Sequence, residues 1–192
     1  MHGLGNDFII FDAPAAGAPG AETFRRLADR YTGIGFDQAL MLEPPRKPGT
    51  AVYYRIFNAD GREVEQCGNG ARCIARFLRE RNGVISGDLV LDSPGGLVQT
   101  KMDGDRVSVT MGVPDFNPAS LPFEASGEAY VYPLSVGASD VEIGAVSVGN
   151  PHAVIRVPSV ADAPVARLGP AIENHPRFPK RTNVGFMEVV DR

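Results

Sequence analysis

A short segment around Cys67 combines the residue types that proton transfer at carbon requires. Residues 65–72 read Glu-Gln-Cys-Gly-Asn-Gly-Ala-Arg, and a helical pattern follows directly. A thiol at a glycine-rich turn that opens a helix lies at the positive end of the helix dipole, which predicts a stabilised thiolate and a lowered pKa. The free N–H groups of such a turn also favour a bound carboxylate. The segment therefore predicts a base, Cys67, beside an anion-binding turn.

The second cysteine of the chain, Cys73, falls within the predicted helix on the side of Ile74 and Phe77. A cysteine in that setting is usually a packed and unreactive apolar residue, and we interpret Cys73 in this way. The same interpretation remains an alternative to a functional thiol for Cys67. Two cysteines this close together make no disulfide framework, and no His, Cys and Asp spacing indicates a metal site.

Composition excludes several classes of protein. The net charge of −4 gives no case for nucleic-acid binding, and 43% hydrophobic residues are ordinary for a globular core. The first residues lack the basic start and apolar core of a signal peptide. No apolar run approaches the roughly 20 residues that a membrane span needs. We therefore expect a soluble cytoplasmic protein that does not bind membranes.

Short strands dominate the first part of the chain. The spacing of apolar residues predicts strands at residues 8–11, 38–42, 52–57, 89–91, 97–102 and 107–111. Helices are expected at residues 21–31 and 69–81, the first followed by Gly33 and the second by Gly83 as stop signals. Asp103-Gly104 predicts a hairpin. Strands in hairpins around few helices favour an α+β domain over a βαβ array.

Residues 112–127 interrupt this pattern. They hold Pro114, Pro118 and Pro122 with little periodicity, so we expect an inter-domain crossing. Strands are predicted again at residues 130–134, 144–148, 153–157 and 185–190, with a short helix at 168–174 that has Pro170 in its first turn. The chain is thus predicted to contain two domains, residues 1–112 and 113–192.

The two halves resemble each other weakly, which predicts a duplicated domain. The Asn6 turn resembles the Asn150 turn at an offset of 150 − 6 = 144 residues, and residues 34–36 resemble residues 184–186 at an offset of 150. These offsets project a counterpart of Cys67 to positions 211–217, beyond Arg192. We therefore expect an incomplete second domain in a C-terminally truncated chain.

Polar amide side chains occur near every one of these motifs. An amide both donates and accepts hydrogen bonds without carrying charge, so a site built from amides suits a zwitterion with a carboxylate and an ammonium. Each alone is also a common turn or cap residue. The amides are Asn6, Gln38, Asn58, Asn69, Asn150 and Asn183.

Six motifs, taken in order and with their approximate spacing, resemble the diaminopimelate epimerase family. They lie at residues 1–8, 33–38, 55–61, 65–72, 149–152 and 181–186, and residues 65–72 are the most specific. The resemblance implies an α+β fold of two pseudo-symmetric domains, each a curled, mostly antiparallel sheet around a central helix. It implies a pyridoxal-independent isomerase without a cofactor, homodimeric at full length. Such an enzyme interconverts LL- and meso-diaminopimelate, a small-molecule substrate, on the route to lysine and peptidoglycan precursor.

The resemblance also implies roles for individual residues. Cys67 would be the first of two catalytic thiols that face the α-carbon from opposite sides, and His152 would tune the thiol pKa values. The other implied roles concern substrate binding: Gly68 and Asn69 hold the reacting carboxylate with Asn6 and Gln38 nearby, and Asn58, Asn150 and Asn183 hold the distal end.

The chain departs from the family pattern in one respect that matters for chemistry. The family's second cysteine motif is absent from these 192 residues, and so is the Glu-Arg pair that precedes it. Two alternatives therefore remain beside an epimerase. One is a cofactor-independent racemase of another amino acid, and the other is a non-catalytic truncated chain that only binds a ligand or partner.

Overall fold

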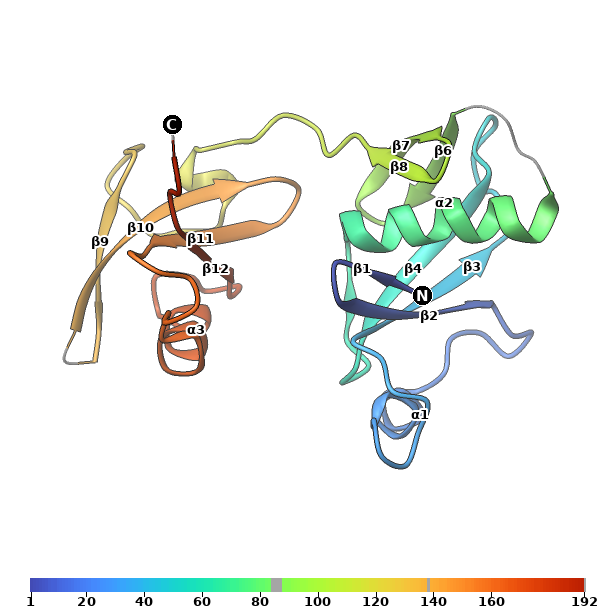
Figure 1. The fold of residues 1–192 in the computed structure, drawn as a ribbon, viewed down its shortest axis with the longest axis horizontal. Coiled ribbons are helices and arrows are strands. Elements are labelled where there is room, and N and C mark those ends of the chain that lie inside the picture. The colour runs from blue at the N-terminus through green and yellow to red at the C-terminus, as the bar shows by residue number, and fades with distance from the viewer. Residues whose placement is uncertain (84–87, 138, 192) are drawn as a thin grey trace. The chain divides into compact units, whose positions relative to one another are not determined.

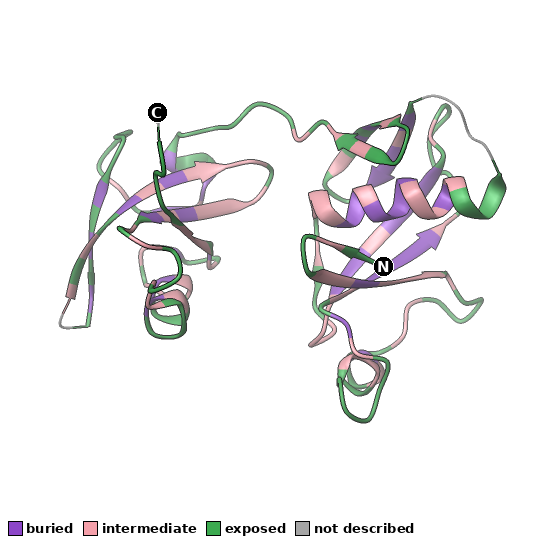
Figure 2. Cartoon of the chain, viewed as in Figure 1, coloured by how far each residue is buried: buried purple, intermediate pink, exposed green. Residues whose placement is uncertain are grey.

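The computed structural model describes residues 1–83, 88–137 and 139–191. The chain divides into two compact units, Met1–Met111 and Gly112–Arg192. Each unit has its own β-sheet and its own buried apolar residues, as Figures 1 and 2 show.

The first unit contains an eight-stranded sheet with the order β1-β2-β3-β4-β6-β7-β8, in which β5 pairs with β4. The pairs β2–β3 and β4–β6 are parallel, and all others are antiparallel. The strands are β1 (His2–Gly3), β2 (Asn6–Asp12), β3 (Gln38–Glu43), β4 (Val52–Asn58), β5 (Glu63–Val64), β6 (Leu89–Ser93), β7 (Gly96–Asp103) and β8 (Arg106–Val109). The predicted Asp103-Gly104 hairpin is confirmed as the β7–β8 turn. The short strands β1 and β5 were not predicted.

Helix α2 (Gly68–Asn82) is the central element of this unit. It contacts β1 and β2 at one end of the strand order and β7 and β8 at the other, so the sheet curves around it (Figure 1). Its buried side chains recur at helical spacing and share one apolar core with residues of the strands. They are Ala71, Cys73, Ile74, Ala75 and Leu78.

Helix α1 (Ala21–Ala28) contributes to a second apolar cluster. Phe24 stacks on Phe57 of β4 with ring centroids 4.7 Å apart. The prediction that this helix extends to residue 31 was wrong. The carboxylate of Asp29 accepts hydrogen bonds from the backbone N–H groups of Tyr31 and Thr32, which ends the helix, and Tyr31 is 97% exposed.

The second unit contains a four-stranded sheet with the order β12-β11-β10-β9, in which only β11 and β12 are parallel. Its elements are β9 (Tyr132–Val136), β10 (Ser139–Ser147), β11 (Pro151–Arg156), α3 (Val165–Glu173) and β12 (Asn183–Met187). Helix α3 buries Leu168 and Ile172 in the core of this unit. The helix begins earlier than predicted, so Pro170 lies inside it rather than in its first turn. Proline has no backbone N–H, so α3 lacks the hydrogen bond that residue 170 would otherwise donate to the carbonyl of Ala166.

The segment 112–127 begins at the boundary between the two units, where a crossing was predicted, but its later part also packs into the second unit. It contains a 3₁₀ helix, η1 (Pro118–Ser120), and Leu121 and Phe123 are buried in the core of the second unit. Phe123 stacks on Phe178 with ring centroids 4.5 Å apart. Pro118, one of the three prolines of this segment, starts a helical turn and is itself buried.

The two units share one arrangement of elements. In the first, β2 leads through α1 to the parallel strand β3, and in the second, β11 leads through α3 to the parallel strand β12. Phe8 pairs with Gln38 and His152 pairs with Asn183, so the offsets are 152 − 8 = 144 and 183 − 38 = 145 residues. The structure thus supports the predicted repeat. The predicted match of residues 34–36 with residues 184–186 was wrong in register. Its offset of 150 residues is five more than the offset of 145 that the strand pairing gives.

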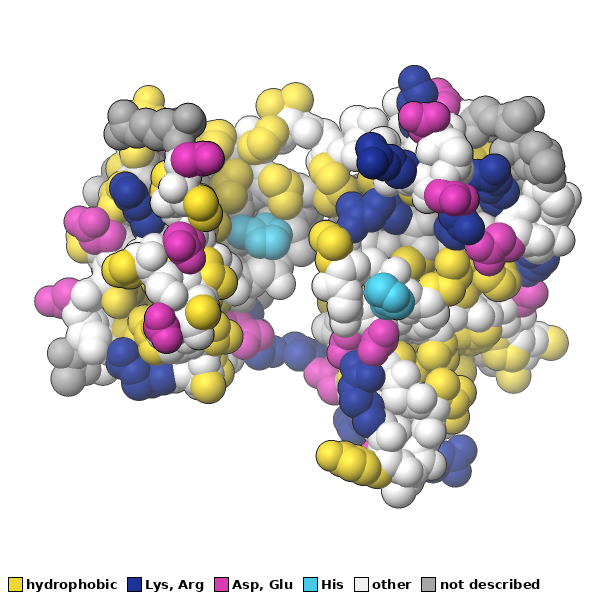
Figure 3. Space-filling model, viewed as in Figure 1, with side chains coloured by type: hydrophobic (Ala, Val, Ile, Leu, Met, Phe, Trp, Pro, Cys, Tyr) yellow, Lys and Arg dark blue, Asp and Glu magenta, His cyan; other side chains and the backbone are white. Residues whose placement is uncertain are grey.

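The described helices include none that is long and apolar enough to cross a membrane. On the visible face of the first unit, Lys and Arg side chains alternate with Asp and Glu rather than forming a patch of one sign (Figure 3). Within the first unit, oppositely charged side chains form ion pairs, such as Arg76 with Glu80 and Arg81 with Asp12.

Candidate active site

Three of the predicted amides lie together at one edge of the first sheet. Asn6 opens β2 and Gln38 opens β3, and these strands are parallel, so both residues lie at the same end. Asn58 closes β4, which runs antiparallel to β3, and it pairs directly with Gln38. Residues far apart in sequence are therefore brought together by strand direction and register.

Cys67 joins this group because it is the N-cap of α2. Its Sγ accepts a hydrogen bond from the backbone N–H of Gly70 at 3.4 Å and lies 4.0 Å from Oδ1 of Asn6. Gly68 and Asn69 are the first two residues of the helix, so their N–H groups have no intrahelical acceptor. The arrangement of thiol, helix start and free N–H groups is the one that the sequence predicted.

The glycine at position 70 allows the start of α2 to lie close to the strands. A Cβ at this position would lie 3.0 Å from Cδ2 of Leu40 on β3 and 3.5 Å from the ring of Phe8 on β2. Because the helix start lies this close to the strands, Cys67 is held near their amide-bearing ends.

The predicted lowering of the Cys67 pKa was wrong. Burial raises the pKa of the Cys67 thiol above its usual value, and the N–H groups of Gly70 and Asn69 and the charge of Arg72 lower it without reversing the effect. The side chain packs against the apolar core of the unit, where the charged form is poorly solvated. Cys67 is therefore mainly a thiol at neutral pH. Cys73 lies in the core at 5% exposure, as predicted.

Gln38 carries an unused acceptor. Its Nε2 donates to Oδ1 of Asn58 at 2.8 Å, whereas its Oε1 is buried and has no partner among the described residues. A buried acceptor left unpaired costs about 1–3 kcal/mol, and a bound donor such as an ammonium group would remove that cost. The amide of Asn69 differs, because its Oδ1 already accepts from Arg72 one turn later.

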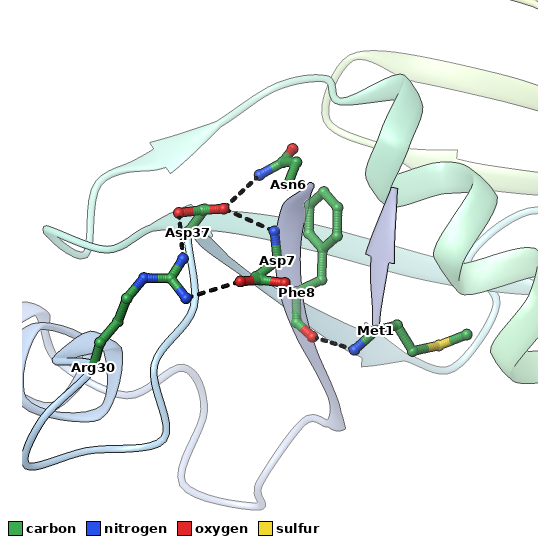
Figure 4. A network of polar contacts seen from close by, with 6 residues as sticks. All are labelled: Met1, Asn6, Asp7, Phe8, Arg30 and Asp37. Atoms are coloured by element: carbon green, nitrogen blue, oxygen red, sulfur yellow. Dashed lines mark hydrogen bonds and ion pairs between the residues drawn. The ribbon is translucent and has the colours of Figure 1, made fainter. Parts of the chain in front are cut away.

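Asn6 is held by a network of ionic groups that Figure 4 shows from close by. Its Nδ2 donates to Oδ2 of Asp37 at 3.3 Å, and the backbone N–H of Asp7 donates to the same oxygen at 2.7 Å. Arg30 bridges the two carboxylates, with 2.9 Å to Asp37 and 2.8 Å to Asp7. We had not predicted roles for Arg30 or Asp37, although Asp37 directly precedes Gln38.

Comparison with known proteins matches the whole chain to one family. A family model described as Diaminopimelate epimerase matches residues 1–117 and 144–192. The chain belongs to the diaminopimelate epimerase family. It is 50% identical over 194 residues to a diaminopimelate epimerase of Stutzerimonas stutzeri (strain A1501) and 51% identical over 199 residues to one of Nitrosomonas eutropha (strain DSM 101675 / C91 / Nm57). Both matches cover 100% of this chain and 70% of the relative.

Solved structures of amino-acid racemases and epimerases have the same fold. A probable proline racemase from Agrobacterium radiobacter K84 superposes with a TM-score of 0.64 at 18% identity, covering 96% of this chain and 63% of that one. A hydroxyproline epimerase from Agrobacterium vitis gives 0.61 at 15% identity, covering 92% and 61%. The α+β fold with curled sheets that the resemblance implied is thus confirmed, and the diaminopimelate epimerase family to which the chain belongs is one of isomerases.

The second unit holds the remaining residues that the family resemblance implied. His152 and Asn183 pair across the parallel strands β11 and β12. The Nε2 of His152 lies 2.9 Å from Oδ1 of Asn150, and Nδ2 of Asn183 donates to the carbonyl of Pro151 at 3.1 Å. Burial lowers the pKa of His152, which favours the neutral ring. By the repeat, Asn183 is the counterpart of Gln38.

Proposed function

We propose that this chain carries the first thiol of a two-thiol diaminopimelate epimerase, in which Cys67 exchanges the α-proton of LL- or meso-2,6-diaminopimelate. The observation that carries the proposal is the position of Cys67 at the N-cap of α2 beside Asn6, in a chain that belongs to this family. The reaction needs no cofactor in this proposal. It serves lysine and peptidoglycan-precursor biosynthesis, and the complete enzyme is a homodimer.

The chemistry assigned to the first unit begins with the Cys67 thiolate, which removes the α-proton and becomes a thiol. The carbanion left on the substrate is stabilised as its charge spreads into the carboxylate, which Gly68 and Asn69 bind through their backbone N–H groups at the helix start. Because burial raises the pKa of Cys67, only a minor thiolate fraction is present at neutral pH, and the rate of proton removal rises with pH.

Substrate binding in this proposal is divided among the amides. Asn6 and Gln38 lie beside the reacting end, where the unpaired Oε1 of Gln38 accepts a hydrogen bond from an ammonium group. Asn58, Asn150 and Asn183 bind the distal amino-acid end, and His152 tunes the thiol pKa values. A second ammonium and carboxylate on the substrate would need all three of these amides, and the presence of all three favours diaminopimelate over a shorter amino acid.

The test is deuterium uptake from D₂O at the α-carbon of LL-diaminopimelate, followed by NMR with the purified chain and its Cys67→Ser variant. We expect uptake that depends on Cys67, with retained configuration. Cys73 is buried and cannot return a proton to the opposite face, so no meso isomer should accumulate. Equal exchange in both proteins would overturn the role of Cys67, and rapid formation of the meso isomer would overturn the need for a second thiol.

A racemase of another amino acid is distinguished by the substrate. Asn58→Ala should slow exchange of diaminopimelate more than exchange of alanine, which has no distal end to bind. Equal slowing with both substrates would favour the general racemase. Absence of exchange with either substrate, despite binding of diaminopimelate, would favour a non-catalytic chain.

A further inference from the structure

The network around Asn6 determines which atom of its amide faces Cys67. A carboxylate only accepts hydrogen bonds, so the group that Asn6 presents to Asp37 must be the Nδ2 amino group. The carbonyl Oδ1 then points to the other side, where Sγ of Cys67 lies 4.0 Å away. In this orientation the Nδ2 amino group of Asn6 donates to the carboxylate of Asp37, and its Oδ1 faces the S–H group of Cys67. The opposite orientation would place Oδ1 against the carboxylate, where two acceptors meet.

Asp37 is itself held in place by groups that leave it little freedom. Its Oδ2 accepts from the backbone N–H of Asp7 at 2.7 Å, and its Oδ1 accepts from Arg30 at 2.9 Å (Figure 4). Arg30 reaches Asp7 as well, at 2.8 Å, so the guanidinium ties the end of α1 to the start of β2. The side chains of Arg30, Asp7 and Asp37 are about half exposed, so their ion pairs add little to the free energy of folding. Their main effect is to hold the Asp37 carboxylate in place.

We propose that Asp37, anchored by Arg30, is a positioning residue that fixes the amide of Asn6 with its carbonyl toward Cys67 and thereby favours the thiol form of Cys67. The functional meaning of this proposal rests on the proposed role of Cys67 as the proton-transferring thiol. The orientation itself can be tested without any turnover.

The proposal has a definite chemical consequence. A carbonyl oxygen accepts from an S–H group and repels a thiolate, whereas an amide N–H group stabilises a thiolate. If Asp37 loses its charge, the amide of Asn6 is free to turn and present Nδ2 to the sulfur. The thiolate then becomes easier to form and Cys67 reacts faster at neutral pH. Among the other titratable groups, the charge of Arg72 on α2 lowers the pKa of Cys67. Burial, and to a smaller extent Cys67, raise the pKa values of Tyr54 on β4 and Cys73 on α2. None of these groups contacts Asp37 in the described residues.

The experiment measures the rate of iodoacetamide alkylation of Cys67 against pH, in a Cys73→Ala background so that one thiol remains. In Asp37→Asn we expect the alkylation rate at pH 7.5 to rise roughly threefold to tenfold, as expected when about one neutral hydrogen bond changes sides. Asp12→Asn is the matched control. Like Asp37, Asp12 is a carboxylate that pairs with an arginine, in this case Arg81. It lies at the end of β2 opposite to Asn6, away from Cys67.

A double-mutant cycle separates positioning from direct charge effects. If Asp37 acts through Asn6, then Asp37→Asn has no further effect on the alkylation rate in an Asn6→Ala background. If the rate still rises there, Asp37 acts on the thiol directly and the proposal is wrong. Arg30→Gln provides a second route to the same loss, and a smaller rise in rate is expected.

These outcomes are independent of the proposed function. An unchanged alkylation profile in both Asp37→Asn and Arg30→Gln, with circular dichroism like that of the parent, would overturn the positioning role and leave the exchange test untouched. A profile that shifts as expected in a chain that exchanges no α-proton would keep the positioning role and refute the function.

Discussion

Replacing Cys67 should separate its role in stability from its role in chemistry. Cys67 is the N-cap of α2, and its sulfur accepts the N–H of Gly70 at 3.4 Å. Serine is among the best N-cap residues and alanine among the poor ones. Cys67→Ser should therefore keep the helix start, whereas Cys67→Ala should weaken it, although both remove the thiol.

The expected magnitude follows from the cap. Loss of an N-cap acceptor costs typically about 1 kcal/mol, with a range of about 0.5–2 kcal/mol. Both variants lose the contact of the sulfur with the surrounding apolar core, so this term largely cancels between them. We expect Cys67→Ser to unfold with a free energy about 1 kcal/mol greater than that of Cys67→Ala.

Two measurements check this difference. Urea unfolding followed by far-UV circular dichroism gives the stability difference, and hydrogen exchange by NMR gives the local effect at Gly70. The Gly70 amide donates to the cap and should exchange about five times faster in the alanine variant than in the serine variant. Exchange of the substrate α-proton should collapse in both, because neither side chain is an adequate base.

The reasoning would be refuted by an alanine variant as stable as the serine variant, with equal protection of Gly70. In that case the sulfur would not act as a cap. Retention of α-proton exchange by Cys67→Ser would refute the chemical half of the argument and leave the structural half intact.

Three further predictions concern reactivity, pH and packing. Iodoacetamide should label Cys67 before Cys73, because Cys73 is 5% exposed, and peptide mapping that found Cys73 labelled first would contradict this. The rate of Cys67 labelling should still rise with pH through 9.0, the ordinary pKa of a cysteine, because burial raises the pKa of Cys67 above that value. Burial depresses the pKa of His152 below its ordinary 6.5, so its contribution to stability is present above pH 6.5 and is lost as the pH falls through the folded-state pKa. The urea midpoint should therefore fall on acidification, and less so in His152→Gln; an identical pH profile in the variant would argue against it. Ile74→Ala truncates a fully buried side chain of α2, at 0% exposure, and should lower the free energy of urea unfolding by about 2–5 kcal/mol. Val113→Ala, at a position with 91% exposure, should change it by less than about 0.5 kcal/mol.

Local patterns predicted most of the secondary structure of the first unit. The strands that became β2, β3, β4 and β7 alternate or cluster apolar residues strongly, and α2 has an unbroken apolar face that ends at Gly83. Errors occurred where a single contact overrode the pattern. The carboxylate of Asp29 ended α1 before Tyr31, although the apolar spacing continued to that residue.

The proline-rich segment shows a second kind of error. Composition alone predicted a crossing between domains, yet Leu121 and Phe123 are buried in the core of the second unit. Proline restricts the backbone in the same way whether its neighbours are exposed or buried. Whether such a segment packs depends on an apolar surface elsewhere, here Phe178, that no local pattern reveals.

The candidate site residues could be predicted from the sequence alone, because the Cys67 segment and the amides occur in long, specific motifs. The position of Cys67 at a helix start could be predicted as well, since the glycines and the helical pattern are local features. The behaviour of these residues depends on the folded structure. The pKa of Cys67 is raised rather than lowered, because desolvation by the core outweighs the helix start. The orientation of the Asn6 amide depends on Asp37 and Arg30, which are separated from Asn6 by 31 and 24 positions in the sequence. The pairing of β2 with β3 brings them beside it. Electrostatic solvation and hydrogen-bond direction depend on distances in three dimensions, which local sequence patterns do not encode.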